Sequence, residues 1–205
     1  MTESGRLVHV VDDDEAMRDS LCFLLRTAGY ASRGYASAEA FLEARRPRCN
    51  SCILLDMRLP GMGGPALQAA LSACGESTPI IFVTGHGDVP MAVEALKRGA
   101  FDFLEKPFED RQLLARVAQA LENDLVRRER EAQEVVRRGR LASLTAREQE
   151  VLARVLQGKP SRVIADELHV TLKTVEFHRA RILTRLGVHS AAELFHLFLA
   201  PDVLQ

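Results

Sequence analysis

The chain has 205 residues, of which 47% are hydrophobic and 27% charged, proportions typical of globular proteins. This length fits one large domain or two small ones, each able to bury its own core. No apolar run approaches the ~20 residues needed to cross a bilayer, and the N-terminus lacks the features of a signal peptide. We therefore expect a cytoplasmic protein with no membrane partner.

The four cysteines fit a reducing compartment. Cys22 and Cys74 fall within apolar helical patterns and are predicted to be core residues. Cys49 and Cys52 have the spacing of a zinc or redox pair, but neither a second pair nor a nearby histidine completes such a site. We interpret this spacing as chance, with Cys52 opening a buried strand.

Strand-like and helix-like segments alternate five times from residue 7 to about residue 122. This alternation predicts an α/β domain with a doubly wound parallel sheet of flavodoxin-like order 2-1-3-4-5. The expected strands are 7–11, 31–35, 52–56, 80–84 and 100–104. The expected helices are 15–28, 37–45, 63–74, 89–98 and 110–122.

The last of these helices continues as a pattern to residue 138, beyond the α/β domain. Its apolar stripe gives way to a charged segment, which fits either a solvated helical linker or a dimeric coiled coil. The mixed charges favour the linker. Gly139 is expected to end the helix. The predicted organisation is an α/β domain at 1–122, a linker at 123–140 and a second domain at 141–205.

The second domain is predicted to be a small all-α bundle. Thr145 and Glu148 have the spacing of a capping box at the start of its first helix. A three-residue turn then joins a short helix to helix 172–186, an arrangement typical of the helix-turn-helix. Residues 139–205 carry nine basic and seven acidic side chains, whereas residues 1–122 carry 13 and 17. The basic excess is compatible with DNA contact.

Four of the five predicted strands end in side chains suited to phosphate or metal chemistry. Asp12 and Asp13 follow the first strand, and Asp56 closes the third. Thr84 and Lys106 stand at the ends of the fourth and fifth. Because ligands bind at the carboxyl edge of an open parallel sheet, we expect these side chains to lie close together. The aspartate run alone would equally fit a solvated turn.

These residue types also suit each other chemically. Oxygen ligands from Asp12, Asp13 and Asp56 suit Mg²⁺, which keeps positions for water and phosphate, and Mn²⁺ is an alternative. A free oxygen of Asp56 would be a carboxylate nucleophile toward a phosphoryl group. Lys106 would hold the phosphoryl oxygens as a point charge, and the Thr84 hydroxyl would donate to one of them.

The same set of residues resembles the receiver domain of bacterial two-component response regulators. The resemblance covers about residues 5–122 and is greatest to the FixJ branch of these regulators. The matching residues are Asp12-Asp13, Asp56, Thr84 and Lys106-Pro107, separated by 43, 28 and 22 residues from Asp13 onward.

The resemblance implies that a sensor histidine kinase phosphorylates Asp56. It implies a Mg²⁺ site that also includes the backbone carbonyl of Arg58. It further implies a cis Lys106–Pro107 peptide bond and a switch role for Phe103, for which a plain core position is the alternative.

Residues 141–199 resemble the LuxR-type DNA-binding domain. The matching segments are Leu144 to Glu148, Ile164-Ala165, Thr174 to Arg179 and Leu186-Gly187. The resemblance implies binding to double-stranded promoter DNA, with RNA polymerase as a further partner to consider. The whole chain then resembles a FixJ/NarL-type transcription factor, which accepts and can lose a phosphoryl group but is not a turnover enzyme.

Helical geometry selects the DNA-binding face of helix 172–186. At 100° per residue, Val175, Ile182 and Leu186 share the core side, so the opposite side would enter the major groove. Aromatic and methyl groups there would contact thymine, and a carboxylate would accept from cytosine. Arg179 is placed for a phosphate contact. The predicted DNA-binding residues are Lys173, Thr174, Glu176, Phe177, Arg179, Ala180, Arg181 and Thr184.

We expect phosphorylation to promote homodimerisation on helix 89–98 and strand 100–104, through Val89, Ala92, Val93 and Leu96.

Two alternative functions compete with a regulator. One is a Mg²⁺-dependent phosphohydrolase, which lacks a visible second acid–base pair, and the other is a constitutive DNA-binding protein with a relic receiver.

Overall fold

A computed structural model describes residues 5–44, 49–85 and 89–199. The chain divides into two compact units, Met1–Arg130 and Glu131–Gln205. Each unit has its own hydrophobic core. Among the described residues, no helix is both long enough and apolar enough to span a bilayer.

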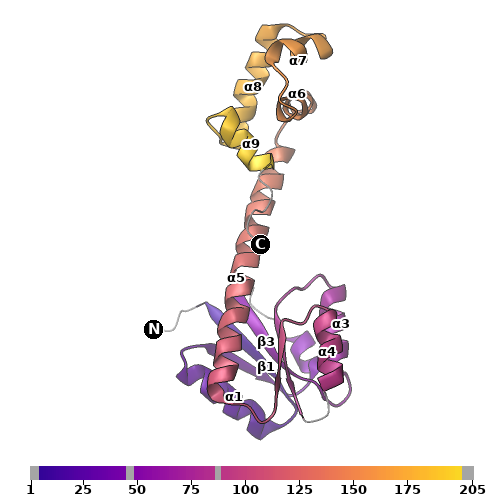
Figure 1. Cartoon of the computed structure of the whole chain (residues 1–205), viewed down its shortest axis with the longest axis vertical. Coiled ribbons are helices and arrows are strands. Elements are labelled where there is room, and N and C mark those ends of the chain that lie inside the picture. Colours follow the sequence, from indigo (N-terminus) through magenta and orange to yellow (C-terminus); the bar gives the residue numbers. More distant parts are fainter. Residues whose placement is uncertain (1–4, 45–48, 86–88, 200–205) are drawn as a thin grey trace. The chain divides into compact units, whose positions relative to one another are not determined.

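The first unit is built on a five-stranded parallel sheet (Figure 1). Its strands are β1 (Arg6–Val11), β2 (Ala31–Tyr35), β3 (Asn50–Asp56), β4 (Ile80–Thr84) and β5 (Asp102–Glu105). The strand order β2-β1-β3-β4-β5 confirms the predicted topology. Val11 pairs with Leu55, and Thr84 pairs with Glu105, so the carboxyl ends of neighbouring strands are in register.

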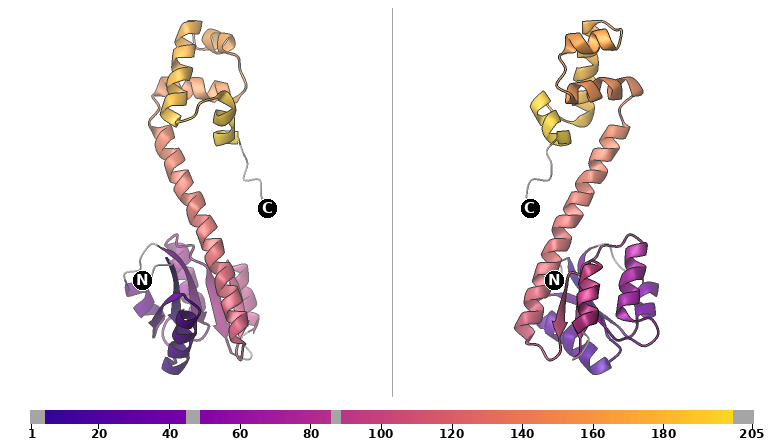
Figure 2. Two further views of the ribbon diagram at one scale, coloured as in Figure 1. Left: turned by 90° about the vertical axis from the view of Figure 1, so that its left-hand side faces the viewer. Right: turned by 45° about the vertical axis from the view of Figure 1, so that its right-hand side comes forward.

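Helices cover both faces of this sheet (Figures 1 and 2). The core on one face is contributed by α1 (Glu15–Thr27) and α5 (Asp110–Ala142), and includes Leu25 and Val117. The core on the other face is contributed by α2 (Ala38–Glu43), α3 (Gly64–Ala73) and α4 (Val89–Lys97). The apolar runs of β3 and β4 are buried on both sides, as expected for parallel strands.

Local features turn the chain sharply where β1 and β3 end. The Asp14 carboxylate caps α1 by accepting hydrogen bonds from the backbone N–H groups of Ala16 and Met17. Gly64 lets α3 start close to the end of β3. A Cβ at this position would lie 2.4 Å from the Asp56 carbonyl oxygen and 3.0 Å from the Phe82 ring. Glycine is therefore required by space rather than by backbone conformation.

Several details differ from the sequence-based expectations, and one is that β3 begins at Asn50 rather than at Cys52. Helix α5 continues through Gly139 to Ala142, so this glycine does not end the helix. An exposed glycine costs a helix only about 1 kcal/mol, which the flanking residues offset. Cys74 is exposed at the end of α3, so its predicted core position is wrong, whereas Cys22 is buried as predicted. Strand β5 starts at Asp102, because Gly99 and its neighbours form a turn.

The second unit is helical beyond the end of α5. It comprises α6 (Ala146–Leu156), α7 (Ser161–Glu167), α8 (Leu172–Leu186) and α9 (Ala191–Leu199). Thr145 and Glu148 form the predicted capping box at α6. Val151, Ile164 and Ile182 join α6, α7 and α8 in one apolar core. The tight connection between α7 and α8 confirms the predicted helix-turn-helix arrangement.

Candidate functional site

Three carboxylates gather at the carboxyl edge of the sheet. Oxygen atoms of Asp12, Asp13 and Asp56 all lie within 4.8 Å of one another. Asp12 is buried, Asp56 is partly buried and Asp13 is exposed. In the described part of the chain this is the one group of three or more ligating side chains close enough to hold a cation. β1 and β3 are neighbours at the point where the strand order reverses, so their carboxyl ends bring the three aspartates together, as the predicted order implies.

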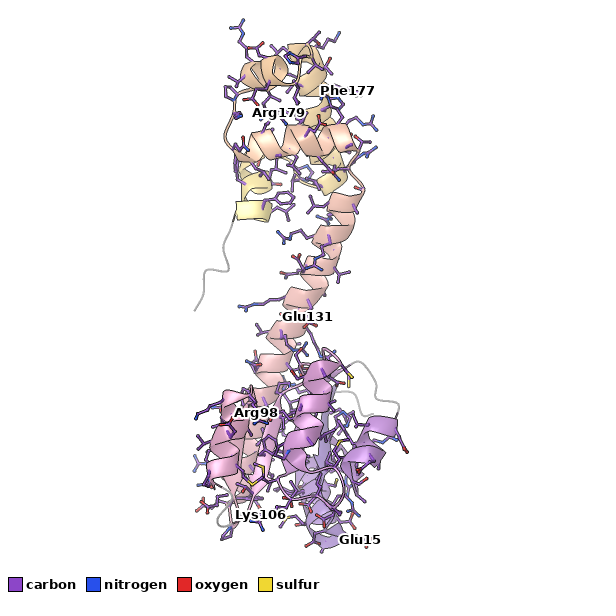
Figure 3. The ribbon with its side chains drawn as sticks, turned by 90° about the vertical axis from the view of Figure 1, so that its right-hand side faces the viewer. Glu15, Arg98, Lys106, Glu131, Phe177 and Arg179 are labelled. Atoms are coloured by element: carbon purple, nitrogen blue, oxygen red, sulfur yellow. The ribbon has the colours of Figure 1, made fainter. Side chains whose placement is uncertain are left out.

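Lys106 bridges two of these carboxylates. Its Nζ lies 3.2 Å from Asp12 Oδ2 and 3.0 Å from Asp56 Oδ2. Lys106 follows β5, and its backbone N–H donates to the carbonyl oxygen of Thr84 (2.7 Å). The Lys106–Pro107 peptide bond is cis, as the resemblance implied. Lys106 is labelled in Figure 3, at the same end of the first unit as Glu15, the first residue of α1.

The ion pairs and burial act in opposite directions on these groups. Burial raises the pKa of the Asp12 carboxyl above its ordinary value, although the charge of Lys106 opposes this. Burial lowers the pKa of Lys106, but the hydrogen bond and charge of Asp56, together with Asp12, outweigh it and leave the pKa raised. Lys106 therefore stays protonated between the two acids.

Backbone N–H groups fix the second oxygen of each bridged carboxylate. Asp12 Oδ1 accepts from the Asp14 N–H at 2.9 Å, and Asp56 Oδ1 accepts from the Arg58 N–H at 3.0 Å. Lys106 and these two backbone N–H groups thus hold both oxygens of each bridged carboxylate in position. Clustered oxygen donors with one exposed member fit a hard cation such as Mg²⁺, which retains several water ligands.

The two predicted switch residues lie on β4 and β5. The Thr84 side chain is completely buried, and its hydroxyl donates to the Gly85 carbonyl oxygen at 3.2 Å. Phe103 is partly buried and packs against the core that α2, α3 and α4 share. Phe103 pairs with Phe82 across the sheet, one position before the pairing of Leu104 with Val83. A hydroxyl bound only to a neighbouring carbonyl can rotate to a new acceptor.

Helix α4 presents only part of the predicted dimer face. Val93 is 42% exposed and Leu96 is half-buried, while Met91, which the sequence analysis did not select, is 46% exposed. Ala92 is completely buried in the core, so its predicted place on this face is wrong. The side chain of Val89 lies outside the described residues.

Helix α8 separates a buried side from an exposed side as predicted. Val175, Ile182 and Leu186 are buried. Phe177 is 56% exposed, although a phenylalanine is usually buried, and lies on α8 together with Arg179 (Figure 3). The predicted residues that are exposed are Lys173, Glu176, Phe177, Ala180, Arg181 and Thr184.

The remaining α8 residues are engaged with the protein itself. Thr174 is partly buried, and its N–H and hydroxyl bond the Thr171 side chain that caps the helix. Arg179 reaches Ser161 on α7 at 3.3 Å. His178 is partly buried, and its Nδ1 is enclosed, in agreement with a packed helix-edge histidine. Arg179 is partly exposed, and this contact places it beside the first residue of α7.

The buried carboxylate of Glu148 contacts two arginines of α8. The sequence predicted only a capping role for this residue. Glu148 is 1% exposed. Its carboxylate lies 3.0 Å from Arg185 and 3.4 Å from Arg181, and accepts from the Thr145 N–H at 2.8 Å. Arg181 also lies over the Phe177 ring, 5.5 Å from its centre. Only the three-dimensional packing brings these arginines to the capping box.

Known families match both units of the chain. Residues 8–118 match the response regulator receiver domain, and residues 142–198 match the luxR family of bacterial regulatory proteins. The transcriptional regulatory protein FixJ of Azorhizobium caulinodans is 43% identical over 96% of this chain and 93% of its own length. The C4-dicarboxylate transport regulator DctR of Rhodobacter capsulatus is 46% identical, over 91% and 96% respectively.

Solved structures agree with these matches. The response regulator StyR aligns with a TM-score of 0.85 and 45% identity, covering 94% of this chain and 97% of StyR. Full-length FixJ from B. japonicum aligns with a TM-score of 0.59 and 41% identity, covering 93% and 94%. A receiver followed by a luxR-type helical domain defines a response regulator of a two-component system. Within that class, the chain belongs to the FixJ-type transcriptional regulators.

The Glu148 cluster predicts pH-dependent stability of the helical unit. The backbone hydrogen bond from Thr145, with further help from Arg185 and Arg181, lowers the pKa of Glu148 below its ordinary 4.5. Because the folded-state pKa is lowered, the stabilisation is present above the unfolded pKa and is lost as pH falls through the folded one. Glu148→Gln should cost about 1–3 kcal/mol at pH 7, and less below pH ~4. Urea unfolding at several pH values measures this, with exposed Glu176→Gln as the control.

Proposed function

We propose that this chain is a phosphorylation-dependent transcription factor, in which a sensor histidine kinase phosphorylates Asp56. The observation that carries the proposal is the bridging of Asp12 and Asp56 by Lys106 at the sheet edge, within one unit of a chain that ends in a luxR-type domain. Phosphorylation then promotes pairing of two receivers and binding of α8 to promoter DNA.

The residues around Asp56 support its role as the phosphoacceptor. Asp12 and Asp13, with Asp56 and the Arg58 carbonyl, would hold Mg²⁺, which supplies positive charge that offsets the carboxylates and the incoming phosphate. An Asp56 oxygen attacks phosphorus, the bond to the donor breaks, and the donor leaves with that electron pair. Lys106 already contacts Asp56 Oδ2 and can retain a phosphoryl oxygen as its partner.

Thr84 and Phe103 supply the link from the phosphoryl group to the surface. The new phosphoryl oxygens compete for the Thr84 hydroxyl, which now donates only to the Gly85 carbonyl. Moving Thr84 leaves space that Phe103, packed beside α4 and partly buried, fills by turning inward. This repacking changes the surface of α4 and β5, where Val93 and Met91 expose apolar area.

The exposed side of α8 supports recognition of double-stranded DNA. Lys173, Phe177 and Ala180 are exposed on α8, whose buried residues are Val175, Ile182 and Leu186, as expected for a helix that enters the major groove. Phe177 and Ala180 suit thymine methyl groups, and Glu176 suits a cytosine amine. Two receivers that pair bring two such helices to one operator, which increases affinity through effective concentration.

Asp56→Asn should abolish phosphorylation by acetyl phosphate and Mg²⁺, because the amide lacks the nucleophilic oxygen. Intact-mass spectrometry detects the adduct in the wild-type chain and in the control Asp19→Asn, an exposed position on α1. An undiminished adduct in Asp56→Asn would move the phosphoacceptor elsewhere. Continuous phosphate release by the wild type would favour a phosphohydrolase, and no reaction would favour a relic receiver.

Lys173→Ala and Phe177→Ala should each weaken specific operator binding by about 1–3 kcal/mol if the side chain contacts a base. Arg179→Ala should weaken binding to all sequences alike and reduce its salt dependence, because it contacts a phosphate. Fluorescence anisotropy on operator and scrambled duplexes measures both effects. Gln157→Ala, exposed at the end of α6, serves as the control. Unchanged operator affinity in all three variants would show that α8 is not the recognition helix.

Val93→Asp should prevent dimerisation of the phosphorylated protein, because it places a carboxylate on the exposed apolar face of α4. Sedimentation velocity at micromolar concentration, with and without acetyl phosphate, measures the monomer–dimer equilibrium. Phe23→Asp is a matched control, since Phe23 is an exposed apolar residue of α1 at 65%. If phosphorylated wild-type protein stays monomeric yet gains operator affinity, activation instead unmasks the DNA-binding unit.

A further inference from the structure

One arginine of α1 is bound to the main chain of the acidic cluster rather than to its carboxylates. Arg18 Nη1 donates to the carbonyl oxygen of Asp12 at 2.8 Å and lies 3.5 Å from the carbonyl oxygen of Asp13. Arg18 is partly buried, one turn into the helix that Asp14 caps. Its guanidinium therefore holds the peptide units that carry two of the three clustered carboxylates.

Strand β2 provides space for the stem of this arginine. Gly34 pairs with Val10, two residues before Asp12. A Cβ on Gly34 would lie 3.0 Å from Cγ and 3.1 Å from Cδ of Arg18. The missing side chain thus lets Arg18 lie across the end of β2 and reach the end of β1. The conformation of Arg18 is determined by packing as well as by its hydrogen bonds.

Arg18 and Lys106 differ in the atoms that they bind. Lys106 occupies carboxylate oxygens of Asp12 and Asp56, the same atoms that a cation would need. Arg18 binds main-chain carbonyl oxygens of Asp12 and Asp13, which are not the carboxylate atoms that Lys106 occupies. Binding of a cation to the carboxylates can displace Lys106 but leaves the bonds of Arg18 intact.

We propose that Arg18 is a positioning residue for the metal site, holding Asp12 and Asp13 in the arrangement that binds a divalent cation. This inference rests on the proposed function, since it assigns a role within the same site. The positive charge of Arg18 and its support of the Asp12 and Asp13 backbone have opposite effects on the affinity of the site for a cation. A nearby positive charge weakens cation binding, whereas an ordered ligand pair strengthens it. The proposal requires the second effect to exceed the first.

Isothermal titration of the full-length chain with MgCl₂ tests this directly. Arg18→Gln should bind Mg²⁺ roughly 10-fold more weakly than the wild type, as is usual when a residue supporting metal ligands is lost. Gly34→Val keeps the charge but places a branched side chain where the Arg18 stem lies, and should also weaken binding. Both variants should be phosphorylated more slowly by acetyl phosphate at subsaturating Mg²⁺, and at a rate close to wild type when Mg²⁺ saturates.

Arg26→Gln is the matched control, because it removes the same charge from an exposed position in the last turn of α1. Thermal unfolding without Mg²⁺ verifies that each variant is folded. If Arg18→Gln is unfolded, the Mg²⁺ affinity of Gly34→Val tests the positioning role instead. Wild-type or tighter Mg²⁺ affinity in either folded variant would overturn the positioning role. A wild-type chain that neither binds Mg²⁺ nor forms an adduct would instead overturn the proposed function itself.

Discussion

The ion pairs of Lys106 with Asp12 and Asp56 are the interaction on which the arrangement of the sheet edge depends. Three carboxylates with oxygens within 4.8 Å repel each other by roughly 3.5 kcal/mol per pair at an effective dielectric constant near 20. Lys106, which follows β5, offsets part of this repulsion and connects that end of the sheet to the ends of β1 and β3. The same lysine also occupies the oxygens that a cation or phosphoryl group would use. A bound ligand could therefore replace Lys106 on these oxygens.

The sequence predicted that Asp12, Asp13, Asp56 and Lys106 lie close together because the relevant physics is local to each strand. An apolar run that ends in Asp56 or Thr84 identifies a buried parallel strand, and the strand order then determines which ends are neighbours. Prediction was poorer where one pattern fits two structures. Ala92 was predicted on the dimer face beside Val93, but it is buried, because it shares the inner side of α4 with Ala95 three residues further on. Gly139 has a low helix propensity, yet α5 continues through it.

The contacts of Arg18 and Glu148 were beyond sequence analysis for a different reason. Arg18 binds backbone carbonyl oxygens, which every residue has, so no residue type marks its partner. Glu148 was found as a capping residue from its spacing to Thr145, but its two arginines come from another helix, 33 and 37 residues further on. Such contacts appear only when the packing of whole helices is known.

The described part of the chain contains three buried carboxylates with basic partners. The ratio of acidic to basic groups differs between the carboxylates that stabilise the fold and the one at the candidate site. Asp124 is completely buried and paired with Arg127 and Arg128, and Glu148 is paired with Arg181 and Arg185. Each of these groups has two cations for one acid, and backbone N–H groups complete its hydrogen bonds.

The Asp12 group has the opposite balance. Of its three acids, Asp12 and Asp56 share Lys106, and Arg18 adds one more positive charge only through the main chain. Among the contacts of the described residues, the cluster therefore has more acidic than basic groups. Such an excess at a partly buried site is costly unless a further cation binds. It persists at the carboxyl edge of the sheet, where Asp13 is exposed and a ligand has access. The two groups in which arginines outnumber the acid stabilise the fold, whereas the acidic excess around Asp12 would be stabilised by the cation that we propose it binds.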